Sequence, residues 1–329
     1  MVLQSLAGAS SWRVDQSVGG GTAVPPPTAA RGHRTRSFRS LVERAEPWFY
    51  VGPALIVTVV LALSPVVYLI QAMFKEMEFG DPISQAPFAG LDNFRAAFGE
   101  SARIIDGLRL TGIYTTVALT VEVLLGLIIA LIIENLKRLL PFVMSVFLIP
   151  MVVMPAMVAM VWRLYFSYEG LVNWVIGLLG ASPLNWYGPE HAMKAVIITD
   201  VWQWTPFFVL LFTAGLQNVP REIKEAAEVD GATAWQVLRQ IKLPLLMPLV
   251  VIAATLRVME LVRQFDLPYI MFGGGPGSAT RTLPLAVHNT TVQKLDVGTG
   301  SVLSLVLILL VVLVSWFFLF AMKRARVTH

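Results

Sequence analysis

The chain has 329 residues, of which 56% are hydrophobic and only 14% charged, and its net charge is +4; its mean hydropathy of +0.69 lies well outside the range of soluble domains. It contains no cysteine, which excludes a disulfide framework, a thiol nucleophile and a thiolate metal site. The four histidines, His33, His191, His288 and His329, show no ligand spacing, so a zinc site is not expected.

Residues 1–45 form a leader whose composition differs from the rest of the chain. It is rich in Gly, Pro, Ala and Thr and lacks a periodic apolar pattern, so we expect a disordered cytoplasmic segment. No short apolar stretch with a small-residue cleavage site precedes the first long apolar run, so the leader is not a secretory signal. Residues 46–329 are predicted to form a transmembrane domain.

The transmembrane domain contains six runs that are long and apolar enough to cross a bilayer, which requires about 20 residues in a helix. They lie at about 48–73, 108–133, 139–161, 192–217, 245–270 and 299–322. The predicted fold class is therefore an all-α polytopic membrane protein with six transmembrane helices and with both termini on the same side. Prolines inside these runs, such as Pro53, Pro150 and Pro206, predict kinked helices.

The orientation of the chain is predicted from Lys and Arg in the connecting loops, because these residues resist translocation. With the N-terminus inside, fifteen basic residues lie on the inner side and six on the outer side. The inner residues are Arg13, Arg31, Arg34, Arg36, Arg39, Arg44, Lys137, Arg138, Arg221, Lys224, Arg239, Lys242, Lys323, Arg324 and Arg326; the outer residues are Lys75, Arg95, Arg103, Arg163, Arg281 and Lys294. Both termini are therefore expected in the cytoplasm. The positive net charge needs no nucleic-acid partner, since these residues face an anionic leaflet.

The chain shows no motif that would supply energy or covalent chemistry. It lacks a phosphate-binding loop, a nucleophile elbow and a zinc-binding helix motif. The glycine-rich run at 273–277 is not followed by a Lys-Ser/Thr pair or preceded by a predicted strand, so it is interpreted as a flexible turn. Any work that the protein performs must be driven by a partner or by an ion gradient.

The loop between the fourth and fifth spans, residues 220–244, is unusually polar for so apolar a chain. A first helix is predicted to end at Gly231, which permits a turn that a side chain would obstruct. A second helix, Ala234–Lys242, then leads into the fifth span. The short side chains of Ala226 and Ala227 would let another protein approach closely, so this helix-turn-helix is suited to a cleft in a cytosolic partner. The alternative is a solvated connector.

Polar residues inside the spans are candidates for a substrate pathway, because charged groups in the membrane are costly. At 100° per residue, Arg257, Glu260 and Gln264 share one face of the fifth span. Carboxylates, amides and aromatic rings suit a carbohydrate, which offers hydroxyls and an apolar face. The predicted pathway residues are Asp200, Gln203, Trp204, Arg257, Glu260, Arg263 and Gln264, with Glu122 in the second span nearby. The alternative is that Arg257 with Glu260, or Arg263 with Asp266, forms ion pairs for assembly or gating.

The polar loop resembles the EAA loop of the inner-membrane permease subunits of bacterial ATP-binding-cassette (ABC) importers. The matching residues are Glu225, Ala226, Ala227, Asp230, Gly231, Ile241, Leu243 and Pro244. The segments 201–220 and 265–280 are similar to the carbohydrate branch of that family, which includes the maltose-type permeases. The resemblance covers the chain except for the leader.

The resemblance implies a type I ABC importer permease fold in the bacterial plasma (inner) membrane. Its expected partners are a second permease subunit, most simply in a heterodimer, two cytosolic ABC ATPase subunits that bind ATP-Mg, and an extracytoplasmic solute-binding protein. The expected substrate is a carbohydrate, such as a di- or oligosaccharide or a sugar alcohol. The chain itself is expected to be no enzyme and to hold no cofactor. Glu225 is expected to be the main polar contact with the ATPases.

Two other functions are weighed against this one. A gradient-driven secondary carrier would use the charges of the fifth span as an ion-coupling site, but it would leave the EAA loop unexplained, and no internal repeat relates the two halves of the chain. A membrane-embedded enzyme would need Glu260 and Asp266 as acid and base, yet these residues are predicted to lie on different faces of a helix.

Overall fold

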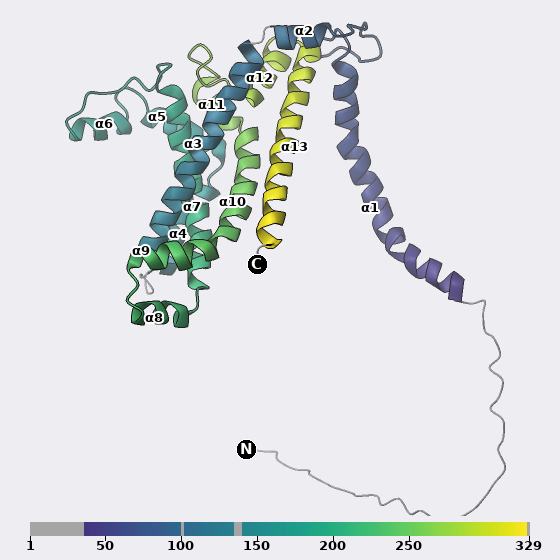
Figure 1. The fold of residues 1–329 in the computed structure, drawn as a ribbon. Coiled ribbons are helices and arrows are strands. Elements are labelled where there is room, and N and C mark those ends of the chain that lie inside the picture. The colour runs from purple at the N-terminus through teal and green to yellow at the C-terminus, as the bar shows by residue number, and fades with distance from the viewer. Residues whose placement is uncertain (1–35, 100–101, 135–139, 328–329) are drawn as a thin grey trace, which may run out of the picture. The chain divides into compact units, whose positions relative to one another are not determined.

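The computed structural model describes residues 36–99, 102–134 and 140–327, and these ranges are mainly helical, with no strand among them (Figure 1). The predicted disorder of the leader up to residue 35 lies outside the described residues. The elements are α1 (Arg36–Ala72), α2 (Asp92–Gly99), α3 (Ala102–Ile133), α4 (Leu140–Val152), α5 (Pro155–Tyr165), α6 (Leu171–Leu178), α7 (Ala192–Gln217), α8 (Arg221–Val229), α9 (Ala234–Val237), the π-helix η1 (Leu238–Lys242), α10 (Leu243–Arg263), α11 (Asp266–Phe272), α12 (Leu283–His288), the π-helix η2 (Asn289–Gln293) and α13 (Val297–Val327).

The chain divides into two compact units, residues 1–61 and residues 62–329. Helix α1 begins in the first unit, at Arg36, so residues 36–45 of the predicted leader are helical. This stretch contains Leu41, Glu43, Arg44 and Ala45, which are good helix formers. The candidate sites described below lie entirely in the second unit.

Among the described residues, five helical stretches are long and apolar enough to cross a membrane, and α4 with α5 adds a sixth crossing if the pair counts as one bent span. The predicted third span at 139–161 is thus two helices that meet at 93°. Pro155 is the first residue of α5, and the residue before a proline is pushed out of the helical region; Met154 accordingly has ψ 132°. Gln203 of α7 donates a hydrogen bond to the carbonyl of Val153 at this break, over 3.0 Å.

The predicted fifth span at 245–270 is also interrupted. Helix α10 ends at Arg263, Gln264 has ψ 119°, and α11 begins at Asp266. Pro268 explains the break, because its ring has no N–H to donate to the carbonyl four residues earlier, at Gln264, and would collide with it. The prediction that Gln264 shares a helix face with Arg257 and Glu260 assumed one continuous helix. Gln264 instead lies one residue beyond the end of α10.

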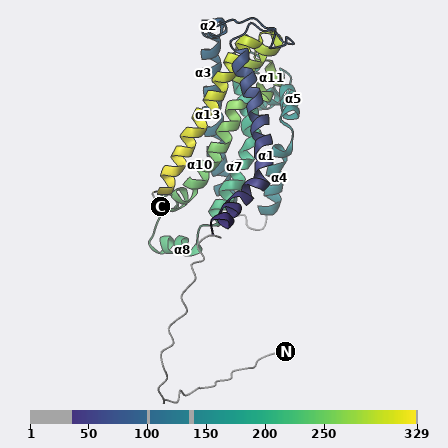
Figure 2. The same cartoon turned by 90° about the vertical axis from the view of Figure 1, so that its right-hand side faces the viewer.

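The core of the second unit is formed by α3, α7 and α10, which pack on one another, with α13 against α10 (Figures 1 and 2). The bundle has two ends, which we name by the short helices found there. The α2 end carries α2, α11 and α12, and the α8 end carries α8, α9 and the last turns of α13. Two of the buried clusters in this unit lie around Phe166, Trp186 and Leu267 and around Phe208, Phe212 and Leu246.

Helices α3 and α7 are in close contact at Gly126. A Cβ atom built on Gly126 would lie 2.4 Å from Cβ of Phe208, a distance that requires the helices to separate. We expect Gly126→Ala to lower the free energy of unfolding by about 1–3 kcal/mol through overpacking. The matched control is Gly112→Ala in the same helix, where nothing lies within 4 Å of the added atom, so that only the helix-propensity gain of about 1 kcal/mol remains. Thermal unfolding in detergent compares the two, and equal midpoints would contradict the expected close packing.

Candidate functional site

The segment between α7 and α10 is a helical hairpin at the α8 end of the bundle. Helix α8 ends at Val229, and Gly231 adopts a left-handed φ of +73°, a conformation that favours glycine. The backbone N–H groups of Asp230 and Ala232 donate to the carbonyls of Ala226 and Ala227, over 3.0 and 2.9 Å. The small residues of the EAA motif thus accept the hydrogen bonds that end the helix, and the predicted break at Gly231 is confirmed.

The second arm of the hairpin covers the predicted range Ala234–Lys242, but its last turn is the π-helix η1. Thr233 begins it with a capping box, in which its hydroxyl accepts from the backbone of Gln236 and the Gln236 side chain accepts from the backbone of Thr233. Ile241 and Leu243 are half-buried and Pro244 is exposed where η1 passes into α10. The hairpin is therefore a continuous extension of α10.

The hairpin presents both acidic and apolar groups to its surroundings. Glu225 and Asp230 are exposed, and Val229, Trp235 and Ile223 expose 87%, 64% and 42% of their surfaces. Large apolar groups on an otherwise polar element typically mark a surface that another protein covers. The surface built by these residues, which we call the hairpin surface, is a candidate docking site.

A buried ion cluster joins α3, α7 and α10. Arg257 donates to both carboxylate oxygens of Glu122, at 2.9 Å each, and to Oδ2 of Asp200 at 2.5 Å. The two carboxylates are fully buried and the guanidinium is 3% exposed. The Arg257 guanidinium also lies 4.5 Å from the centre of the Trp204 ring, within the range of a cation–π interaction. Arg257 therefore has a charge partner on each of the two neighbouring helices.

The pairing that the sequence suggested for Arg257 is a minor part of this cluster. Glu260, one turn away on α10, contacts Arg257 at 3.4 Å and remains 47% exposed. A helical wheel displays neighbours on one helix only, so it could not reveal that Glu122 and Asp200 are the closer partners. For Arg263, the structure shows a hydrogen bond from Nε to the carbonyl of Met259, over 3.0 Å.

A hollow of about 360 Å³ opens beside the ion cluster, between α7, α10 and α13. Its lining comprises Trp204, Phe207, Leu256, Arg257, Met259, Glu260, Arg263 and Val311. Four of the predicted pathway residues, Trp204, Arg257, Glu260 and Arg263, thus meet at one place. Asp200 accepts a hydrogen bond from Arg257 but does not line the hollow. Gln203 is 1% exposed and donates to the carbonyl of Val153. Gln264 is not part of the lining either. The hollow combines two aromatic rings, a carboxylate and two guanidinium groups.

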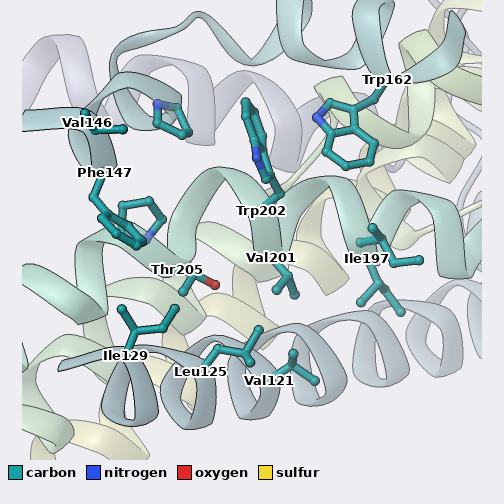
Figure 3. A pocket seen from close by; sticks show the side chains of 13 residues that line it. Val121, Leu125, Ile129, Val146, Phe147, Trp162, Ile197, Val201, Trp202 and Thr205 are labelled. Carbon is teal, nitrogen blue, oxygen red and sulfur yellow. The ribbon is translucent and has the colours of Figure 1, made fainter. Parts of the chain in front are cut away.

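A second hollow, of about 680 Å³, has a different chemistry (Figure 3). It lies between α3, α4, α5 and α7, and its wall includes Leu125, Phe147, Trp162 and Trp202, with the hydroxyl of Thr205 as its one labelled side-chain oxygen. Such an apolar lining is complementary to hydrocarbon chains and has few groups that can hydrogen-bond to the hydroxyls of a sugar. The polar hollow beside Arg257 is therefore the better candidate for a hydrophilic solute.

Comparison with known proteins gives consistent matches. The family model described as "Binding-protein-dependent transport system inner membrane component" matches residues 122–328. A probable ABC transporter permease protein of Sinorhizobium fredii is 36% identical over 82% of this chain and 86% of its own length. The trehalose/maltose transport system permease protein of Thermococcus litoralis is 36% identical over 80% of this chain and 89% of its own length.

The fold has a counterpart among solved structures. A chain of a bacterial alginate ABC transporter, crystallised in complex with an alginate pentasaccharide-bound periplasmic protein, superimposes with a TM-score of 0.70. The match covers 84% of this chain and 95% of that one, at 18% sequence identity. At 18% identity, what the match establishes is that the two chains share the same arrangement of helices.

Proposed function

The chain belongs to the family of binding-protein-dependent transport system inner membrane components, and on that premise we propose that it imports a carbohydrate and is driven through the hairpin surface. As a member of that family it is a multi-pass transmembrane permease subunit of an ABC importer, with the type I importer permease fold. It is a transport subunit and no enzyme, since ATP hydrolysis belongs to its partner subunits. The predicted substrate class and the predicted contacts are the parts that require experiments.

The observation that carries the proposal is the exposed hairpin that continues directly into α10. Glu225 offers a charge, Ala226 and Ala227 offer a slim helix, and Val229 and Trp235 offer apolar area to a docking partner. We assign this surface to the cytosolic ATPase subunits, which bind ATP-Mg. It follows that the α8 end of the second unit faces the cytoplasm. We place both chain termini on the cytoplasmic side from the basic residues of the loops.

The substrate pathway is assigned to the hollow beside Arg257. Trp204 lies near the middle of α7 and Val311 near the middle of α13, so the hollow lies at the depth at which a crossing solute needs polar partners. Glu260 and Arg263 offer an acceptor and donors for hydroxyls, and Trp204 offers an aromatic ring. The trehalose/maltose relative supports a sugar as the cargo. A second permease subunit, in a heterodimer, would close the open side of the hollow, and an extracytoplasmic binding protein would deliver the sugar.

Transport in reconstituted vesicles tests the proposed function. The chain, its second permease subunit, its ATPases and its binding protein are placed in liposomes, and uptake of labelled disaccharides and sugar alcohols is measured. We expect uptake that requires ATP hydrolysis and persists when an uncoupler removes ion gradients while ATP is maintained. Uptake that collapses with the uncoupler would favour the gradient-driven carrier instead.

Substitutions in the hollow test the pathway. We expect Glu260→Gln to raise the substrate concentration for half-maximal uptake about tenfold, since a hydrogen bond to a charged group contributes roughly 1.5–3 kcal/mol. Trp204→Ala should raise it by a similar factor, because it removes the aromatic ring that would cover the apolar face of the sugar. The control is Glu190→Gln, which removes an exposed carboxylate before α7. Gln203→Met should leave substrate preference unchanged, because this side chain is bonded to the α4–α5 break. Unaltered concentration dependence in both hollow variants would contradict the pathway.

A further inference from the structure

The hairpin is joined to α3 by an ion pair that the sequence did not indicate. Nζ of Lys242, the last residue of η1, lies 2.6 Å from Oε2 of Glu134, which directly follows α3. The side chains are 18% and 12% exposed, and the two residues are 108 positions apart in the chain. This contact therefore connects the hairpin to a helix that is remote from it in sequence.

The location of Glu134 runs against local electrostatic preference. The C-terminal end of a helix carries a partial negative charge, which disfavours a carboxylate there. Glu134 still belongs to the final turn of α3, because its N–H donates to the carbonyl of Ala130 over 2.9 Å. Lys242 supplies a compensating positive charge at 2.6 Å. Moreover, a partly buried ion pair adds little net stability, so a positional role explains it better.

The Lys242–Glu134 pair is the second of two connections between the same helices. Lys242 precedes α10 and Arg257 lies further along it, while Glu134 and Glu122 occupy the matching positions on antiparallel α3. On each helix the two charged residues are roughly 20 Å apart at 1.5 Å per residue. Two connections at this separation resist both sliding and rotation of α10 against α3.

Helix α7 contacts α10 at two points of its own, one near each of these connections. Asp200 shares Arg257 with Glu122, and a Cβ on Gly215, near the end of α7, would lie 2.4 Å from a methyl group of Leu246 on α10. The three core helices are therefore fixed to one another in the middle and near the α8 end. A displacement of the hairpin that moves α10 must move α3 and α7 with it.

From this geometry we propose that Lys242 and Glu134 are positioning residues that transmit the movement of the hairpin to α3, so that α3, α7 and α10 move as one body in each transport cycle. This inference rests on the proposed function of the hairpin surface. The π-turn at Leu238–Lys242 fits this role, since π-helical turns are frequent at functional sites. When the ion pair is lost, the ATPases still move the hairpin, but less of this movement reaches α3 and the substrate pathway.

The test measures substrate imported per ATP hydrolysed by the complete reconstituted transporter. Lys242→Met and Glu134→Gln should each lower this ratio at least about fivefold while ATP hydrolysis continues. The exchange Lys242→Glu with Glu134→Lys should restore the ratio to within about twofold, since interacting residues couple in a double-mutant cycle. Arg95→Gln is the control, because it breaks an exposed ion pair with Asp92 at the α2 end.

The outcomes separate this inference from the proposed function. If the wild-type transporter shows no ATP-driven uptake, the proposed function fails. If wild-type uptake is normal and either single variant keeps the full ratio, or the exchange variant stays as impaired as the singles, the transmission role is wrong. A purely structural role would lower thermal stability or ATPase co-purification and leave the ratio unchanged.

A distance measurement provides a second readout, because the chain has no cysteine and can be labelled at chosen positions. Spin labels replace Ile132 on α3 and Gln240 on η1, both of which are exposed. In the wild type we expect the distance between the labels to stay constant when ATP is added. In Glu134→Gln we expect it to change or broaden, and a distance that stays equally constant in this variant would overturn the proposal.

Discussion

Arg257→Met is expected to destabilise the bundle by about 3–5 kcal/mol, the cost of removing one member of a buried ion pair. The substitution leaves Glu122 and Asp200, both fully buried, without the guanidinium that lies between them. Two buried carboxylates on the adjacent helices α3 and α7 then repel each other. Thermal unfolding of the purified protein in detergent should show the loss as a lowered midpoint or as aggregation.

Two variants make this prediction specific. Arg95→Gln breaks the exposed pair with Asp92, whose side chains are 80% and 72% exposed, and should cost only about 0–1 kcal/mol. Arg257→Lys keeps the charge but cannot donate to both carboxylates from a planar fork, so its stability should be intermediate. A midpoint for Arg257→Met as high as that of Arg95→Gln would show that the cluster does not hold the helices together.

A triple variant separates stability from transport. Replacing Arg257 by Met together with Glu122 and Asp200 by Leu removes all three charges at once, and apolar residues of similar volume often substitute for a buried ion cluster without loss of stability. If this variant is folded and still transports, the cluster only holds the bundle together. If it is folded but inactive, the charges themselves take part in transport, as the predicted pathway requires of Arg257 and Asp200.

The broad architecture could be predicted because it depends on composition along the chain. Long apolar runs identify the spans, and Gly231 identifies the turn of the hairpin, since each signal is local. The breaks were harder to predict. Pro155 and Pro268 are visible in the sequence, but whether a proline kinks or divides a helix depends on what satisfies the freed carbonyl, and Gln203 does so at Val153 from another helix.

The site was predicted in its residue types but not in its pairings. The cost of a charge in the membrane marks Asp200, Arg257 and Glu260 as unusual in any order of the spans. That Arg257 contacts Glu122 rather than mainly Glu260 follows from the packing of α3 against α10, which periodicity does not encode. The Lys242–Glu134 pair could not be predicted for the same reason, since in the sequence both residues resemble ordinary charged residues at the ends of spans.

Gly231→Pro and Glu225→Lys are each expected to reduce uptake by about two orders of magnitude, because like-charge contact or misplacement at a protein interface costs several kcal/mol. The φ of +73° at Gly231 cannot be adopted by proline, whose ring holds φ near −65°, so the two arms of the hairpin would take a new relative direction. Glu225→Lys reverses an exposed charge and should leave folding within about 0.5 kcal/mol of the wild type. Both variants should insert into the membrane.

The matched control for the glycine is Gly180→Pro. Gly180 has φ +79° and, like Gly231, has nothing within 4 Å of a built Cβ, but it follows α6 in a loop away from the hairpin. Both prolines conflict with a left-handed φ, at different places, and Gly180→Pro also removes the N–H that donates to the carbonyl of Gly177. A larger loss of uptake in Gly231→Pro than in this control therefore reports on the hairpin. Co-purification of the ATPases with each variant gives the cause: we expect it to be lost in Glu225→Lys and weakened in Gly231→Pro. Normal uptake in Gly231→Pro, or equal losses in both proline variants, would mean that the hairpin is a connector and that the ATPases act elsewhere.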